Sequence, residues 1–186
     1  MNSITLIHKF ETALPIIRKW IDDLLNSYGS QTTALIDLAF PTLPQLFPID
    51  LLQKTKVVIL TGKIPYPPLS SIGFPDFASM ENMAFSGVTY KDTYFLNQAY
   101  RQESLHFHEL IHVVQWSTLG VDNFLRAYGI GLLQYGYQNS PLEQMAYFLQ
   151  HKFERGSLPK MEIVELVKTQ TQEIWNNAKP LLPLEK

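Results

Sequence analysis

Two histidines flank a glutamate in the segment HELIH, residues 108–112, within a stretch of helical spacing. At about 100° per residue, positions four apart project from nearly the same face of a helix, so His108 and His112 point the same way. Two imidazole nitrogens at that spacing can reach one ion at about 2.0–2.1 Å. Glu109 stands beside the first histidine, where its carboxylate can take a proton from a water activated by the metal. The pattern predicts a zinc (Zn2+) site with Glu109 as its general base.

A catalytic zinc site usually has three protein ligands and a water, and the chain has no cysteine to supply one. The pattern HExxHxxGxxH is excluded, because Gln115 and Thr118 stand where it requires glycine and histidine. Glu143 is the preferred third ligand, since it begins a predicted helix. Residues 140–143 also read as a capping box, in which the same carboxylate bonds the helix backbone. From the residues alone these two roles stand nearly even. Weaker candidates are Asp122, Glu154 and Glu103.

Two further polar residues lie close to the motif. His106 precedes His108 by two positions, which places it on the far side of the helix and predicts a packed or surface residue. Gln115 lies seven positions after His108, on the same face as the histidine pair. It either orients a zinc-binding histidine or bonds a neighbouring loop, and the sequence does not choose between these roles.

The segment HELIHVVQW, followed some thirty residues later by PLEQMAY, resembles the gluzincin group of zinc metallopeptidases. The likeness is to small bacterial domains that carry HExxHVxQ and then a helical ExxA, and it covers roughly residues 88–155. It implies a zincin-like fold in which His108, His112 and Glu143 bind zinc and Glu109 is the base.

The resemblance has one departure. Gluzincins often place an acid four residues after the ligand glutamate, and here that residue is Tyr147. The resemblance also implies that an extended peptide binds along an edge strand, for which residues 90–96 are the candidate. A tyrosine or arginine that stabilises the oxyanion is expected nearby. The candidates for that role are Tyr128, Tyr135, Tyr137, Tyr147 and Arg126.

Length and composition fit one globular domain over residues 1–186, since the chain is 46% hydrophobic and 17% charged. A net charge of -2 without a basic cluster argues against nucleic acid as a partner. The first twenty residues lack the features of a signal peptide, and no apolar stretch is long enough to span a bilayer. We therefore expect a cytoplasmic protein without a membrane partner.

The elements that must position the site are predicted to be mostly helical, with a small sheet, in an α+β fold. A helical part covers residues 1–50 and the core of the metal site covers residues 88–155. Helices are expected at 3–28, 32–40, 97 or 98 to 116, 122–128, 141–155 and 161–178. Strands are expected at 56–62, and at 87–90 and 93–96 as a hairpin. Residues 64–86 and 129–139 are expected to be irregular.

These features predict a zinc-dependent hydrolase, with a metallopeptidase acting on a peptide or protein as the first hypothesis. A second hypothesis keeps the metal but assigns a dedicated non-peptide or single-protein substrate. A third is a non-catalytic binding or scaffold domain in which HELIH is structural. Oligomeric state is not indicated by the sequence.

Overall fold

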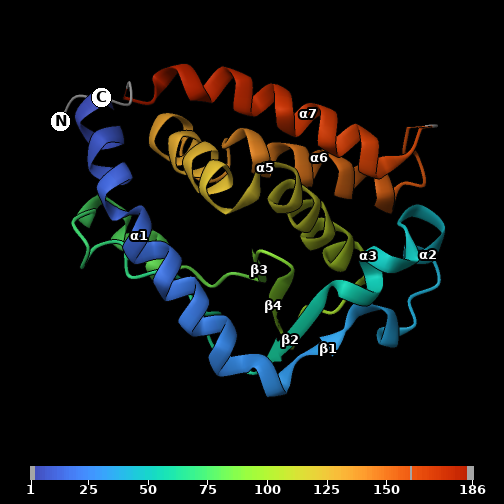
Figure 1. Ribbon diagram of the computed structural model, residues 1–186. Coiled ribbons are helices and arrows are strands. Elements are labelled where there is room, and N and C mark those ends of the chain that lie inside the picture. Colours follow the sequence, from blue (N-terminus) through green and yellow to red (C-terminus); the bar gives the residue numbers. More distant parts are fainter. Residues whose placement is uncertain (1–2, 160, 184–186) are drawn as a thin grey trace.

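The computed structural model describes residues 3–159 and 161–183, and the described chain has the α+β architecture expected from the sequence. Helices surround a small mixed sheet (Figure 1). The α-helices are α1 (Ser3–Tyr28), α2 (Leu43–Leu46), α3 (Ile49–Lys54), α4 (Ala78–Glu81), α5 (Glu103–Tyr135), α6 (Pro141–Glu154) and α7 (Ile163–Ala178). The strands are β1 (Thr33–Ala34), β2 (Lys56–Leu60), β3 (Gly87–Tyr90) and β4 (Thr93–Asn97). Short 3-10 helices cover Gly29–Gln31, Leu35–Leu38, Pro75–Phe77 and Lys179–Leu181.

The sheet has the strand order β1-β2-β4-β3, in which β2 and β4 are parallel and the other pairs are antiparallel. The predicted hairpin is confirmed, since Tyr90 pairs with Thr93 across the turn at Lys91 and Asp92. The expectation that residues 90–96 form an edge strand is wrong. The parallel pairing of β2 with β4 places β4 inside the sheet and leaves β3 at the edge, and this pairing joins segments too distant in sequence for a local pattern to reveal.

Helix α5 begins later and ends much later than its sequence predicts. Strand β4 continues to Asn97, and the helix starts at Glu103. At Gly120 the backbone has φ 71° and ψ 172°, so α5 is two helical halves joined at a kink. The predicted loop at 129–139 is wrong over its first half, which is helical to Tyr135. Its glycines serve packing instead, because a Cβ on Gly129 would lie 2.4 Å from the ring of Phe10.

Other local expectations hold with small changes. Helices α1, α6 and α7 and strand β2 lie within two residues of their predicted bounds. The helix predicted at 32–40 is wrong, because Thr33 pairs with Val57 in the sheet and only a 3-10 turn follows. The irregular segment 64–86 contains two short helical turns and otherwise lacks regular structure.

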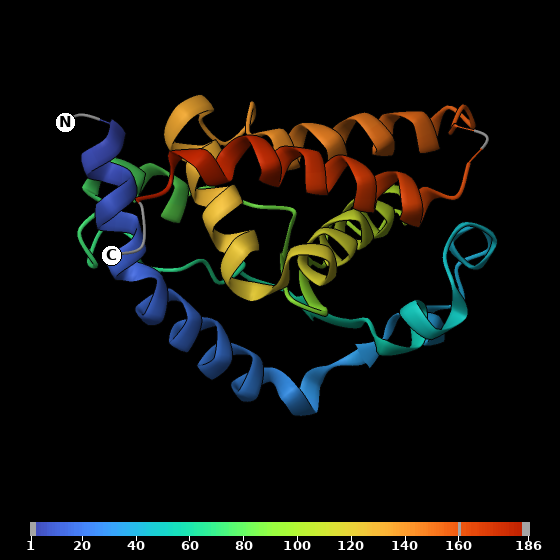
Figure 2. The same ribbon diagram turned by 45° about the horizontal axis from the view of Figure 1, so that its top comes forward.

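Helix α5 is the central element of the fold. Helices α6 and α7 cover one side of it, while α1 and the sheet lie on the other side (Figures 1 and 2). Every residue from His106 to Trp116 is consequently buried, polar residues included. No described helix combines the length and apolar character needed to cross a membrane.

Candidate metal centre

Three buried side chains converge between the first half of α5 and the first turn of α6. His108 and His112 lie one turn apart on α5, and their Nε2 atoms are 3.2 Å from each other. Glu143 on α6 directs Oε2 at both, at 3.7 Å from His108 Nε2 and 3.5 Å from His112 Nε2. Within the described residues, the ligand atoms of this group all lie within 4.8 Å of one another. The three side chains can therefore hold a metal ion.

The electrostatics of this group show strong coupling between its members. Burial opposes a charge on His112, but the adjacent Glu143 carboxylate raises the pKa of His112 to about 9. Burial likewise opposes a charge on Glu143, yet the two imidazoles hold the pKa of this carboxyl well below its usual range. Oε2 of Glu143 also has no hydrogen-bond partner among the described residues, although it is buried. A proton or a cation between these atoms is what the arrangement favours.

Gln115 orients the second histidine. Its Oε1 lies 2.8 Å from Nδ1 of His112, which leaves Nε2 of that imidazole as the free ligand atom. Its Nε2 donates to the carbonyl oxygen of Leu142 at 3.0 Å, in the residue before Glu143. Gln115 thus contacts a histidine of the cluster as one of the two expectations had it, and its other bond goes to the first turn of α6 and not to a loop, so one amide connects the two helices that carry the cluster.

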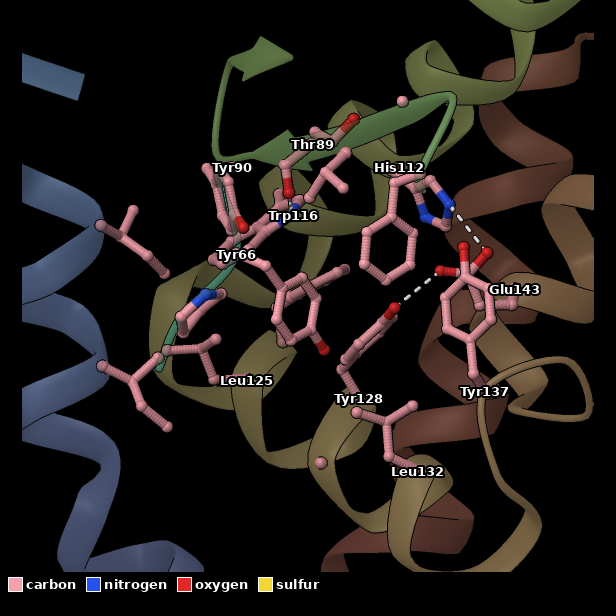
Figure 3. Close-up of a pocket in the computed structure, with 18 of the residues that line it drawn as sticks. Tyr66, Thr89, Tyr90, His112, Trp116, Leu125, Tyr128, Leu132, Tyr137 and Glu143 are labelled. Carbon is pink, nitrogen blue, oxygen red and sulfur yellow. Dashed lines mark hydrogen bonds and ion pairs between the residues drawn. The ribbon is translucent and has the colours of Figure 1, made fainter. Parts of the chain in front are cut away.

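Glu143 is directed into the cluster and not toward its own helix end. Ser140 precedes α6 without a capping hydrogen bond from its side chain, and its buried Oγ has no described partner. The capping box is therefore not formed. Oε1 of Glu143 instead accepts a hydrogen bond of 2.7 Å from the hydroxyl of Tyr128, as Figure 3 shows. Burial, and then the nearby carboxylate, raise the pKa of Tyr128 well above its ordinary value, so the phenol remains a donor.

The first histidine has a different environment. Its Nδ1 is buried and has no hydrogen-bond partner among the described residues. Tyr147, which stands where gluzincins often have an acid, packs its ring against His108 with the centroids 4.7 Å apart. At this position, Tyr147 therefore offers His108 an aromatic contact in place of the hydrogen-bond acceptor that an acid would provide.

Glu109 lies beside the cluster and is held by the edge strand of the sheet. Its Oε2 accepts a hydrogen bond of 2.6 Å from the hydroxyl of Thr89 on β3. A Cβ at Gly87 would lie 2.2 Å from Oε1 of Glu109, so only glycine leaves space for this carboxylate. Burial raises the pKa of Glu109, while the two histidines and Thr89 act in the opposite direction. The sequence did not point to Thr89 and Gly87, because their role depends on β3 lying over α5.

The remaining polar candidates lie outside this cluster. His106 is buried, bonds the hydroxyl of Tyr94 at 2.7 Å, and has its pKa lowered to about 4 by burial. Of the weaker ligand candidates, Asp122 on α5 forms an ion pair of 3.0 Å with Arg18 on α1. Glu103 accepts hydrogen bonds from two backbone N–H groups at the start of α2, and Glu154 lies at the far end of α6.

A pocket opens beside the cluster, with an empty volume of about 740 Å³ that includes its open mouth. Its polar lining contains His108, Glu109, His112 and Glu143, and most of the rest of its wall is apolar or aromatic. Tyr128 and Tyr137 also line it, whereas Tyr135, Tyr147 and Arg126 do not. Arg126 forms an ion pair with Glu11 on α1.

Comparison with known protein families, curated proteins and solved structures finds no match to this chain.

Proposed function

We propose that this chain is a zinc-dependent hydrolase of the gluzincin type, with a zincin-like fold, that cleaves an amide bond. The observation that carries the proposal is the convergence of His108, His112 and Glu143 from two helices, with the Glu109 carboxylate next to them. Oε2 of Glu143 is buried without a hydrogen bond among the described residues and is directed at two imidazoles, an arrangement that a bound cation would complete.

Zinc is the metal that this donor set fits. Two neutral imidazoles and one carboxylate, with room for water, make up a common catalytic zinc site. A tetrahedral ion with bonds of about 2.0–2.1 Å separates its ligand atoms by about 3.3–3.4 Å. The corresponding separations here are 3.2, 3.5 and 3.7 Å. When bound, zinc would activate a water and polarise the carbonyl of the substrate.

The protein residues provide the proton transfer. Glu109 accepts a proton from the attacking water and delivers it to the leaving nitrogen, so it acts first as general base and then as general acid. The hydroxyl of Thr89 holds one carboxylate oxygen in place. The absence of a side chain at Gly87 leaves the other oxygen space beside the pocket.

The test is zinc content combined with turnover. Purified protein should hold about one zinc per chain, and His108→Ala and His112→Ala should lose it. Glu109→Gln should keep the zinc and lose activity by about 10²–10⁴-fold, because general base catalysis contributes that much. Glu154→Gln, at the exposed end of α6, is the matched control and should keep both. A folded protein that takes up no zinc from excess metal would contradict the proposal.

A dedicated substrate is favoured over general proteolysis. The side chains of His108, His112 and Glu143 are only 5%, 7% and 4% exposed, so a folded protein surface cannot reach them. Zinc-loaded protein should therefore leave a natively folded protein such as ubiquitin intact, and gel electrophoresis after prolonged incubation checks this.

A further inference from the structure

We propose that the pocket beside the metal centre binds a linear hydrocarbon chain of the substrate, so that the amide cleaved belongs to an acylated peptide or amino acid. This substrate class rests on the proposed hydrolase function. The name chamber is used for the part of the pocket on the α1 side of the metal cluster. Its lining includes Phe10, Ile17 and Ile21 on α1, Leu125, Gly129 and Leu132 on α5, and Tyr66.

The chamber leads away from the metal cluster toward α1. In Figure 3, Glu143 and His112 lie on one side, α1 lies on the opposite side, and Leu125 and Tyr128 lie between them. No lysine or arginine lines the pocket, and its acidic side chains are the two glutamates at the metal cluster. The far part of the chamber therefore offers no partner for a charged group and favours a neutral apolar one.

The chamber is longer than one amino-acid side chain. Its wall on α1 runs from Phe10 to Ile21, which is about 16 Å along a helix axis at about 1.5 Å per residue. Leu125, Gly129 and Leu132 on the second half of α5 form part of its wall. A long volume with a mostly apolar and aromatic lining fits a chain of methylene groups, each of which lowers the free energy of binding when it leaves water.

An extended peptide would find few backbone partners in the chamber. Most N–H and C=O groups of α1 and α5 are used within their helices, apart from those at the helix ends, at Pro15 and at the Gly120 kink. At the sheet edge, the carbonyl oxygen of Thr89 already accepts a hydrogen bond of 3.2 Å from Nε1 of Trp116. The hydroxyls of Tyr90 and Tyr128 are bonded to Pro65 and Glu143. Peptide groups in the chamber would be desolvated without compensation, whereas a hydrocarbon chain has none to satisfy.

Calorimetric titration with N-acetylglycine amide and N-decanoylglycine amide tests the proposal, with and without zinc. The decanoyl compound should bind at least tenfold more tightly than the acetyl compound in both states. Ile17→Trp should fill the chamber and abolish this preference. Ile16→Trp is the matched control. The side chain of Ile16 neighbours Ile17 in the sequence but is 53% exposed, so this variant should keep the preference. If Ile17→Trp does not fold, Leu125→Phe narrows the chamber from the α5 side.

The outcomes separate this proposal from the hydrolase. Equal affinity for the two amides, or equal behaviour of Ile17→Trp and Ile16→Trp, would overturn the hydrocarbon chamber even if the zinc protein hydrolyses amides. A clear preference for the decanoyl compound in a protein that takes up no zinc would overturn the proposed hydrolase function. The hydrocarbon group bound in the chamber would then no longer be assigned to an amide substrate.

Discussion

Gln115 shows how one buried amide can set the properties of a metal site. It fixes the ring of His112 through Nδ1 and holds the chain that precedes Glu143. Gln115→Met should lower zinc affinity by about 10–100-fold, because partners that orient a ligand typically have that effect. Competition with a chromogenic chelator measures the change. Gln134→Met, exposed on the same helix, should leave the affinity unaltered. Equal affinities for the two variants would mean that Gln115 only packs.

A substitution at Gly87 can displace the Glu109 carboxylate, the proposed general base, without changing Glu109 itself. A methyl group there would meet Oε1 of Glu109 at 2.2 Å and Cδ2 of Leu96 at 2.7 Å. Gly87→Ala should keep zinc and lose roughly tenfold or more of the turnover, since a displaced base forfeits part of its contribution. Metal analysis and amide hydrolysis check the two halves of this prediction. Gly62→Ala is the control, because open space surrounds that position. Full activity in Gly87→Ala would place the base elsewhere.

The residues that a motif can reveal are those that act within one helix turn. His108, His112 and Glu109 stand at fixed spacing on α5, so the sequence alone predicts their common direction. Thr89 and Gly87 act only because an edge strand lies over that helix, and nothing in their local sequence reports this contact. The direction taken by Glu143 depends on Tyr128, which belongs to the second half of α5.

At the scale of elements, Gly120 allows one segment to serve two purposes. The first half of α5 carries the histidines, and the second half carries Tyr128 and a wall of the pocket. Gly120 has φ 71° and ψ 172°, a region that other residues enter at a cost of about 1–3 kcal/mol. Gly120→Ala should lower the free energy of unfolding by about that amount, measured with urea. Gly29→Ala, at an open position without positive φ, should change it little. Equal changes in the free energy of unfolding for the two variants would mean that the backbone at position 120 does not require glycine.

The elements predicted correctly are those with strong local periodicity, such as α1, α6, α7 and the hairpin. The errors have a common cause, which is contact between distant segments. Thr33 extends the sheet because Val57 is available to pair with it. Within α5, a Cβ on Gly129 would lie 2.4 Å from Phe10 and a Cβ on Gly131 would lie 2.6 Å from Ser140, so these glycines allow close packing and do not form a turn. Glycine in a sequence indicates a turn or close packing equally well, and only the tertiary contact decides.

At the scale of the whole molecule, the metal site connects α5 to α6 and should contribute to global stability. A ligand that binds only the folded state stabilises it by about 2.7 kcal/mol at a concentration of 100 times Kd. Removing zinc with EDTA should therefore lower the Tm measured by differential scanning calorimetry, and added zinc should restore it. His112→Ala should melt at one temperature with or without zinc. If EDTA leaves the Tm of the parent protein unchanged, the proposed metal site is contradicted.

The bond from Trp116 to Thr89 has a further consequence, for the association of one copy with another. An exposed strand edge is a template for pairing with a second chain and hence for aggregation. Trp116 occupies a carbonyl oxygen on the free edge of β3, and the opposite edge, β1, is only two residues long. Neither side of the sheet offers a long run of open backbone groups. Trp116→Phe, which removes the donor and keeps an aromatic ring, would leave the Thr89 carbonyl oxygen on this edge without this partner.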